Sequence, residues 1–594
     1  MMFSRIRHLL MVWPRQRVGG LALALLLTIP ALLPLAAPGY FFNAHDGHHS
    51  VFWLYEFDVA LRDGTLWPVW APDHVLGFGY PLWLVYTPLA FFVAEAFHLL
   101  GLGMTTAVKT AWAFWFLVGA AGIYRLARRW WGPTPAVIAA LAYTYAPYHL
   151  VDIYVRAAYA EFAALAIAPW ALLGVVHVWE NPRPRSAALA ALPIAALLLT
   201  HSASPAVFLP LIAGLAVWKS AQAMLARAFR LRPATWTAIA FALGIGLALI
   251  FWLPALLERH YILEADWRRG TYDYTRHFVY PGQFFSTFWG YGFSVPGPGD
   301  GMSFGLGLIP WLIGGVGALA ALGLGRSRLE ECRAEALFLV VASLVALLAM
   351  TPLAAPAWRV IPLIASVQFP WRFLAVSTIG LALLAGAGVR WLENQAGAAT
   401  PFPLVLALLI VLASFPYLQP QLTPIRPEDE NALAIVEFEA KYPDMRGTTS
   451  FAQRRPEEAT SPLIAQYLAG EPLRRAEIVE GEGEVLEQHA AANTAFARVR
   501  SYSDVRLRFY TNYFPGWQAT MDGRPVEITA DPPDGLIGLT LPPGEHMVRL
   551  RFTATPVRRL GQALSLIAAA LIIGLIAWDR LRTVRHGRSE AEPA

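Results

Sequence analysis

The sequence predicts a mainly α-helical, polytopic membrane protein with about twelve crossings, a C-terminal extracytoplasmic β-sandwich and a final anchoring helix. Of its 594 residues, 56% are hydrophobic and 15% are charged, which is not the balance of a water-soluble globule. Apolar runs of about 20 residues, the length that crosses a bilayer core, recur along the chain. Near the C-terminus the pattern changes to alternating apolar and polar residues, which is typical of half-buried strands.

Composition limits the chemistry of the chain. Cys332 is the only cysteine, which excludes an intramolecular disulfide, a cysteine-rich zinc site and an iron–sulfur cluster. The net charge of +5 does not indicate a nucleic-acid partner, because the basic residues lie in short loops and form no continuous patch. Phosphate-binding P-loop and dinucleotide fingerprints are absent from the sequence, which argues against a nucleotide-driven pump.

The apolar runs give the candidate crossings in chain order. They are residues 18–37, 107–126, 135–146, 162–179, 186–200, 203–218, 234–257, 304–324, 334–350, 373–390, 402–417 and 560–578. Arginines precede the first run, as in a signal peptide. We interpret this run as a retained anchor, because it is long enough to span and further spans follow.

The orientation depends on residues 81–101, which are apolar but include Pro81, Pro88, Glu95 and His98. If this segment crossed the membrane, the basic loops that follow would lie outside. If it lies along the surface, those loops share a side with the N-terminal arginines and the basic tail, as the enrichment of Lys and Arg in cytoplasmic loops requires. We therefore predict a surface helix here, a multi-pass protein of the cell (cytoplasmic) membrane, and both termini in the cytoplasm.

Three units follow from this orientation. Residues 1–418 form the multi-pass module with a long first outer loop, 38–106, and residues 558–594 form the last helix and a basic cytoplasmic tail. Residues 419–557 form an extracytoplasmic α/β segment, in which 426–490 are rich in charge and proline and predict mixed helix and loop. Residues 496–500, 505–510 and 547–552 alternate with period two, and Asp522-Gly523 suits a tight hairpin turn, which together predict a small antiparallel β-sandwich.

The densest polar cluster of the N-terminal half follows the first crossing, where residues 43–49 read Asn-Ala-His-Asp-Gly-His-His. We interpret Asp46 as a catalytic base at the bilayer surface, and His48 and His49 as substrate-binding residues. Ordinary solvated loop residues would give the same pattern. A divalent metal is a further alternative, but the spacing matches no standard zinc signature, so we expect neither a metal nor another cofactor.

A second polar segment reads Tyr-His-Leu-Val-Asp-Ile-Tyr-Val-Arg-Ala-Ala-Tyr-Ala-Glu over residues 148–161. Charge at membrane depth is costly unless it is paired or faces water, so such residues are functional candidates. We predict catalytic roles for Arg156 and Glu161 and substrate binding for Asp152 and Tyr154. An ion pair of Arg156 with Glu161 or Asp152 that only fixes the loop is the structural alternative.

His201, at a turn between two apolar runs, and Arg372, where an outer loop enters a crossing, complete the substrate-binding candidates. A lone histidine at such a turn is more often a capping residue. Arg372 could neutralise a lipid-linked phosphate or snorkel to lipid headgroups. The loop at 258–277 mixes arginine forks and aromatic rings, which suit phosphate and sugar, but the same mixture is typical of a solvated membrane-proximal loop.

This layout resembles the GT-C superfamily of integral-membrane glycosyltransferases, with an acid early in a long outer loop, surface helices there, and a second acidic outer loop. More closely, it is similar to bacterial YfhO-type membrane proteins and the membrane-protein family related to 6-pyruvoyl-tetrahydropterin synthase. The motifs that carry the likeness lie at residues 45–48, 154–161, 369–372, 513–517, 522–523 and 543–546.

The resemblance implies that a sugar is transferred from a polyprenyl-phosphate donor to a glycan or lipid acceptor of the envelope at the outer face, with inversion. Asp46 matches the acid that acts as general base in that superfamily. Arg156 or Arg372 would stabilise the departing phosphate, and Glu161 would orient the acceptor or Arg156. The first two outer loops have no Asp-x-Asp pair, a departure from the metal-using members. The synthase label implies no pterin chemistry, because the chain has no recognisable pterin site.

Two other classes of function fit parts of the pattern. A transporter or flippase of lipid-linked saccharides would place charges near the bilayer midplane, whereas the strong charges here gather near the outer surface, which favours the enzyme. A non-catalytic envelope-assembly protein would use the outer β-domain to bind a glycan or a partner.

Overall fold

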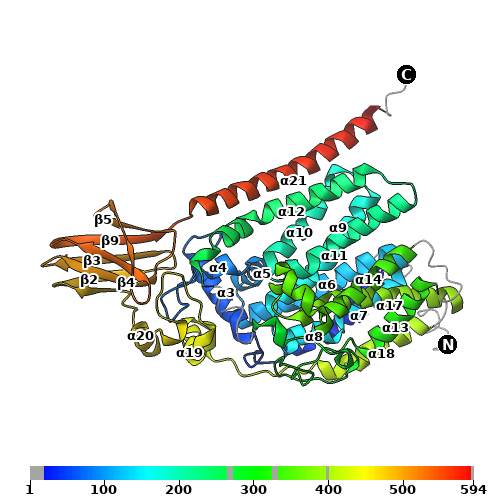
Figure 1. Ribbon diagram of the computed structural model, residues 1–594, viewed down its shortest axis with the longest axis horizontal. Helices are drawn as coiled ribbons and strands as arrows, with labels where there is room; N and C mark the ends of the chain where they lie inside the picture. Colours follow the sequence, from blue (N-terminus) through cyan, green and yellow to red (C-terminus); the bar gives the residue numbers. More distant parts are fainter. Residues whose placement is uncertain (1–18, 264–271, 324–331, 397–400, 590–594) are drawn as a thin grey trace.

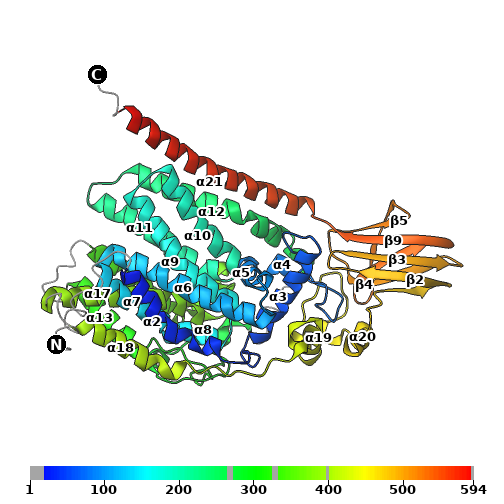
Figure 2. The ribbon, with the colours of Figure 1, turned by 180° about the vertical axis from the view of Figure 1, so that it is seen from behind.

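The computed structural model describes residues 19–263, 272–323, 332–396 and 401–589. Its helices form one large bundle, and its strands form a separate domain at one end of that bundle (Figure 1). Figure 2 gives the same arrangement from behind, with α2 and α6 in front.

All the apolar runs predicted to cross the membrane are helical. They correspond to α2 (Gly19–Ala36), α6 (Met104–Trp131), α7 (Pro133–Thr144), α9 (Tyr159–Glu180), α10 (Pro184–Thr200), α11 (Ser204–Leu225), α12 (Leu231–Leu257), α13 (Leu308–Leu322), α14 (Arg333–Ala349), α17 (Leu374–Ala396), α18 (Phe402–Ser414) and α21 (Pro556–Ser589). In the described part of the chain, 7 helices, or 8 with one bent pair, are long and apolar enough to cross a membrane. The count of about twelve crossings therefore stays a prediction, as does the anchoring role of α21.

Shorter helices occupy the loops between these segments. They are α3 (Gly47–Arg62), α4 (Leu82–Val85), α5 (Leu89–Leu99), α8 (Pro147–Tyr154), α15 (Ala355–Val360), α16 (Pro362–Ala365), α19 (Ala432–Lys441) and α20 (Leu463–Ala469), with short 3-10 turns such as η7 (Pro370–Phe373). At 1.5 Å per residue, the 11 residues of α5 extend about 16 Å, roughly half of a bilayer core. Residues 81–101 therefore do not form a spanning helix, in line with the sequence prediction.

The strands form two antiparallel sheets, ordered β1-β4-β8-β7 and β2-β3-β9-β5-β6. They are β1 (Ala476–Glu480), β2 (Gly483–Ala490), β3 (Thr494–Ser501), β4 (Val505–Asn512), β5 (Trp517–Met521), β6 (Arg524–Val526), β7 (Thr529–Asp531), β8 (Leu536–Leu541) and β9 (Gly544–Phe552). The predicted alternating segments fall in β3, β4 and β9. Asp522 and Gly523, with φ of 52° and 81°, form the β5–β6 turn, the conformation that an Asp-Gly pair favours.

The prediction of helix and loop throughout residues 426–490 was wrong for the last part, which forms β1 and β2. Each is an edge strand of its sheet. The side chains of β2 are exposed or half-buried along its whole length, so the charged residues of this edge hide the period-two pattern. Charged side chains are a common way to protect an edge strand from pairing with another chain.

The β-domain is joined to the first outer loop by buried polar contacts. Arg475 Nη2 lies 2.9 Å from Asp73 Oδ1, and the Asn512 side chain donates to the Gly79 carbonyl at 2.7 Å. Glu439, which precedes the sheets, accepts the backbone N–H groups of Val75 and Leu76. The β-domain and the long first outer loop therefore lie on the same side of the helix bundle, whereas the boundaries of the three predicted units remain predictions.

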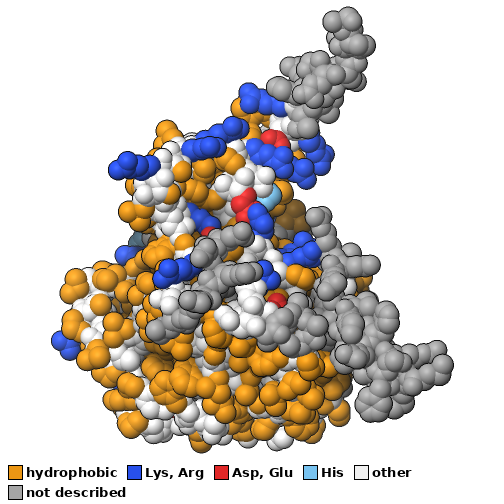
Figure 3. Space-filling view, turned by 90° about the vertical axis from the view of Figure 1, so that its right-hand side faces the viewer, with side chains coloured by type: hydrophobic (Ala, Val, Ile, Leu, Met, Phe, Trp, Pro, Cys, Tyr) orange, Lys and Arg blue, Asp and Glu red, His pale blue; other side chains and the backbone are white. Residues whose placement is uncertain are grey.

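The opposite end of the bundle holds the start of α2 and the end of α21 (Figures 1 and 2). Seen from that end, Lys and Arg gather at the top of the surface, with few acids among them, and hydrophobic side chains cover most of the rest (Figure 3). Large apolar residues such as Leu344 and Leu566 are exposed on α14 and α21, as expected of helices that face lipid. The assignment of the basic end to the cytoplasm stays a prediction, and the basic residues of 1–18 lie outside the described part.

Candidate active site

Asp46 lies where the first two outer loops meet. It directly precedes α3, and its backbone N–H donates to the carbonyl of Arg156 at 2.7 Å. The next residue has to be small, because a Cβ on Gly47 would lie 1.9 Å from the carbonyl oxygen of Phe41. The Asp46 side chain is half-buried and makes no hydrogen bond or ion pair with any described residue. The polar segment 43–49 thus contributes an unpaired carboxyl group beside the polar segment 148–161.

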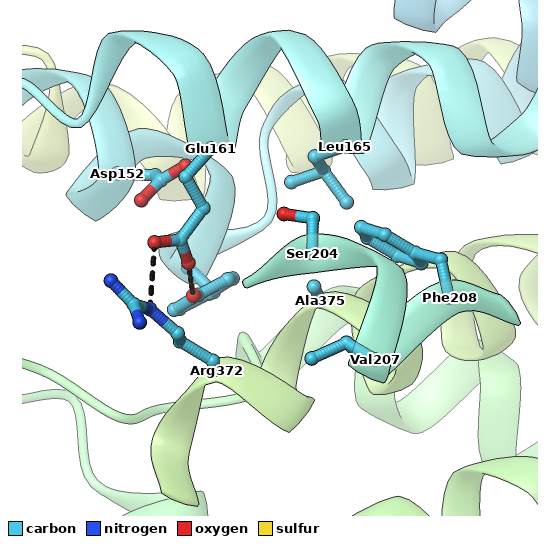
Figure 4. A pocket seen from close by; sticks show the side chains of 9 residues that line it. Asp152, Glu161, Leu165, Ser204, Val207, Phe208, Arg372 and Ala375 are labelled. Atoms are coloured by element: carbon cyan, nitrogen blue, oxygen red, sulfur yellow. Dashed lines mark hydrogen bonds and ion pairs between the residues drawn. The ribbon is translucent and has the colours of Figure 1, made fainter. Parts of the chain in front are cut away.

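Asp152, Arg156, Glu161 and Arg372 form a buried network that we name the arginine–carboxylate cluster. Arg156 bonds to Asp152, and its Nη2 lies 3.0 Å from Glu161 Oε2. Arg372 Nε lies 3.0 Å from the same oxygen, and the Tyr148 hydroxyl donates to Glu161 Oε1 at 2.7 Å. Figure 4 shows these two contacts of Glu161 as dashed lines. All four members are predicted site residues, and the structure brings them together.

Local sequence explains most of this geometry. Asp152 lies in the last turn of α8, and Arg156 follows two residues after the end of this helix, where the turn brings its side chain back to Asp152. Glu161 lies in the first turn of α9, where the helix dipole favours a negative charge. Arg372 comes from η7, directly before α17. The end of α8, the start of α9 and the 3-10 turn η7 therefore bring these side chains together at Glu161.

Two guanidinium groups balance two carboxyl groups in the cluster, and Arg156 is only 3% exposed. The Arg156 guanidinium lies 4.4 Å from the Trp371 ring centroid, a cation–π contact. Burial lowers the pKa of Arg156, but Glu161 and Asp152 raise it, and the result lies above the ordinary value. Arg156 is therefore a permanently charged group whose fork already has acidic partners.

The cavity beside the cluster is small. Its volume is about 10 Å³, room for roughly one water molecule. Its walls come from Tyr148, Asp152, Glu161 and Arg372 on one side and from residues of α9, α11 and α17 on the other: Leu165, Ser204, Val207, Phe208 and Ala375 (Figure 4). Arg372 contacts Glu161 through Nε, and its Nη1 donates to the Val367 carbonyl at 2.7 Å and to the Gln368 side chain at 3.2 Å.

A comparison with known protein families identifies the family of this chain. The model of the 6-pyruvoyl-tetrahydropterin synthase related domain, described as a membrane protein, matches residues 84–420, more than half of the chain. The chain belongs to this family. The matched segment contains the whole arginine–carboxylate cluster, whereas Asp46 and the β-domain lie outside it. No curated protein matches the chain.

Among solved structures, this member of the synthase-related membrane family is similar to the arabinofuranosyltransferase AftD from Mycobacteria. One cryo-EM structure of AftD has 15% identity and a TM-score of 0.44, and the match covers 92% of this chain and 40% of AftD. Two structures of an AftD mutant have TM-scores of 0.43, with 15% and 16% identity, 87% and 90% of this chain covered, and 42% and 41% of AftD. The chain thus spans less than half the length of AftD.

The structure places His48 and His49 on the side of α3 that faces α19. The His48 ring packs against Phe42, Phe52 and Phe438, and the His49 ring against Trp53 and Phe438. Burial, and then the neighbouring His49, lower the pKa of His48 to about 4. Both rings lie in an aromatic cluster and have no direct bond to the arginine–carboxylate cluster, so their substrate-binding role stays a prediction.

Tyr154 and His201 also have structural contacts. The Tyr154 hydroxyl donates to the carbonyl of Ala31 on α2, away from Glu161. His201 follows the end of α10, and its Nδ1 lies 2.8 Å from Ser204 Oγ at the start of α11, so its substrate-binding role stays a prediction. Burial, with Arg372 nearby, lowers the pKa of His201 to about 3, so the ring is neutral.

Sequence reasoning missed two residues of the site. Tyr148 lines the small cavity and bonds to Glu161, and Trp371 carries Arg156 on its ring face. Both adjoin residues that the sequence had singled out, and that proximity was the available signal. In the described part of the chain, no three His, Cys, Asp or Glu side chains are grouped to hold a metal ion. Of the loop 258–277, residues 264–271 lie outside the described part.

Proposed function

We propose that the protein transfers a sugar from a polyprenyl-phosphate donor to an envelope acceptor at the outer face of the membrane, with Asp46 as general base. The proposal rests on one observation: an unpaired carboxyl group lies next to the buried arginine–carboxylate cluster. Asp46 has no ion-pair partner in the described residues, yet its backbone is bonded to Arg156, whose side chain belongs to the buried cluster. The GT-C-like order of these loops along the sequence supports the same assignment.

The proposed reaction is a direct displacement at the anomeric carbon. An acceptor hydroxyl oxygen forms the new bond to that carbon while its proton passes to Asp46. The bond between the carbon and the phosphate oxygen breaks, and its electron pair leaves with the phosphate. Attack from the face opposite the phosphate inverts the anomeric configuration, and a positioned base accelerates such a step about 10²–10⁴-fold.

The two arginines take different parts in this proposal. The Arg372 side chain is 11% exposed and that of Arg156 is 4% exposed, so Arg372 is the more accessible cation. Arg372 contacts the departing phosphate, because a guanidinium fork matches phosphate oxygens. Arg156 and Asp152 are positioning residues, which hold Glu161 and the backbone of Asp46.

The test is to supply the purified protein with a series of polyprenyl-phosphate sugars and to follow consumption of each. Asp46→Asn is expected to lower kcat about 10²–10⁴-fold with unchanged folding. Asp504→Asn is the matched control, since Asp504 is exposed on the β-domain, and it is expected to retain full activity. A folded protein that consumes no donor would support the non-catalytic envelope-assembly role instead, whereas an Asp46→Asn variant as active as the control would overturn Asp46 as the general base.

A further inference from the structure

A second and larger cavity lies where the helix bundle meets the β-domain. Its volume is about 140 Å³. Its walls come from the first outer loop with α4, from α12, from the β2–β3 turn, from the end of β9 and from the start of α21. The lining residues are Thr65, Trp67, Val69, Trp83, Leu84, Ile250, Phe251, Pro254, Asn493, Phe552, Thr553, Ala554, Arg558 and Gln562. None of these residues belongs to the arginine–carboxylate cluster. We name this space the junction cavity.

Among the described residues that line the junction cavity, Arg558 alone is charged, and it is 4% exposed. Its Nε lies 2.9 Å from Glu258 Oε2, and its guanidinium lies over the rings of Phe514 and Phe552, at 5.5 and 5.0 Å. Its Nη1 and Nη2 atoms are buried and have no hydrogen-bond partner in the described residues. A buried charged donor without a partner is costly, so the outer fork of Arg558 has capacity for a ligand with acceptor atoms.

A second donor of the same cavity is also unpaired. The Trp83 Nε1–H is buried and has no partner among the described residues, and Trp83 is 1% exposed. In the described residues that line the cavity, the buried side-chain atoms without a partner are thus donors only. An anion with several oxygen atoms accepts hydrogen bonds from these donors and also carries the charge opposite to that of the guanidinium, whereas a cation does neither.

The remaining walls indicate that the anion is the headgroup of a lipid. Ile250, Phe251 and Pro254 come from α12, and Arg558 and Gln562 from α21, both of which are candidate membrane spans. Leu256 and Leu560, two residues after Pro254 and Arg558 on the same two helices, are 56% and 52% exposed. A buried charge at the end of a spanning helix is a functional-site candidate by default.

We propose that the junction cavity binds the phosphate of a phosphorylated lipid, as a second site separate from the one that contains Asp46. The Nη1 and Nη2 groups of Arg558 donate to two phosphate oxygens, a geometry that arginine provides and lysine does not. The Trp83 indole donates to the same anion, and the lipid chains lie along α12 and α21. The site is formed jointly by the membrane helices and the β-domain, so an occupied site stabilises their contact.

The test measures lipid binding, not turnover, so it is independent of the proposed catalytic function. Wild-type protein is placed in phosphatidylcholine nanodiscs with and without phosphatidic acid, and retained lipid is counted by native mass spectrometry. Arg558→Lys keeps a positive charge for Glu258 but removes the fork, and Trp83→Phe keeps a ring but removes the N–H. We expect phosphatidic acid to bind about tenfold more weakly to Arg558→Lys and severalfold more weakly to Trp83→Phe.

Two controls make the outcome decisive. Arg454→Lys alters an ion pair elsewhere on the β-domain, where Arg454 Nη1 lies 3.2 Å from Asp534 Oδ1, and it is expected to bind lipid as wild type does. Inorganic phosphate is titrated separately, and binding as tight as that of phosphatidic acid would assign the site to free phosphate and overturn the lipid. Equal retention by wild type, Arg558→Lys and Trp83→Phe, or no retention by wild type, would overturn the site. If Arg558→Lys fails to fold, Trp83→Phe alone decides between these outcomes.

Discussion

Arg156 and Arg558 are buried to the same depth, at 3% and 4% exposed, but they differ in their partners. Arg156 bonds to two carboxyl groups and lies over a tryptophan ring. Arg558 has one carboxyl partner, Glu258, and two unpaired Nη atoms. Burial alone therefore does not define the role of an arginine. A guanidinium whose two Nη atoms both contact carboxylates holds the surrounding residues in place, whereas one with two unpaired Nη atoms retains capacity for a ligand.

The largest effect is expected from removal of Arg156. In Arg156→Met, Asp152 and Glu161 both lose a buried guanidinium partner, and breaking a buried pair in this way costs about 3–5 kcal/mol. Arg558→Met should cost less, because Glu258 keeps the hydrogen bond from the Thr555 hydroxyl. Both free energies of unfolding can be measured by denaturation in mixed micelles. A greater loss of free energy of unfolding for Arg558→Met would show that the number of carboxylate partners does not decide how much a buried arginine contributes to stability.

His48, unlike Arg156 and Arg558, has no carboxylate bonded to it in the described part of the chain. Its ring packs among aromatic residues, and its pKa is lowered by burial to about 4. In the unfolded chain the ring takes up a proton as the pH falls through about 6.5. Between these values the unfolded state binds more protons, so stability is full above about pH 6.5 and falls as the pH decreases.

We therefore expect this histidine alone to reduce the free energy of unfolding by about 2 kcal/mol between pH 7 and pH 5. His48→Phe keeps an aromatic ring in the same cluster and should remove that pH-dependent loss. His546→Phe is the matched control, because His546 is on the β-domain and bonded to Asp522. Parallel pH profiles for wild type and His48→Phe would show that His48 is charged in the fold.

Local features of the fold were predictable from sequence. The apolar runs predicted the helices, because a run that is apolar over its whole length leaves no choice of face. The sequence placed Asp152, Arg156 and Glu161 in one short loop that leads into the next helix, and the structure adds the short helix α8, which carries Asp152. The Asp522-Gly523 turn followed from backbone preference alone. Each of these depends on residues within a few positions of one another.

Long-range pairing was not predictable in the same way. Arg372 and Glu161 are 211 positions apart, and Arg558 and Glu258 are 300 positions apart. Nothing in either local sequence selects the partner, since any outer-face acid satisfies the same charge pattern. The edge strands β1 and β2 were missed for a related reason: their pairing is with a neighbouring strand, while their exposed charges conceal the alternation.

The smallest effect is expected at an exposed pair with similar bond geometry. Arg129 Nε lies 2.6 Å from Glu180 Oε1, but the two side chains are 55% and 31% exposed. In water the Coulomb attraction is screened, and the free ions keep their hydration, so such pairs contribute about 0.2–1 kcal/mol. Arg129→Met, measured beside Arg156→Met in the same titration, should change the free energy of unfolding by less than about 1 kcal/mol. A loss as large as that of Arg156→Met would show that the distance between the ions, and not their burial, sets the loss of free energy of unfolding. The contrast between Arg156 and Arg558, which depends on burial, would then have no physical basis.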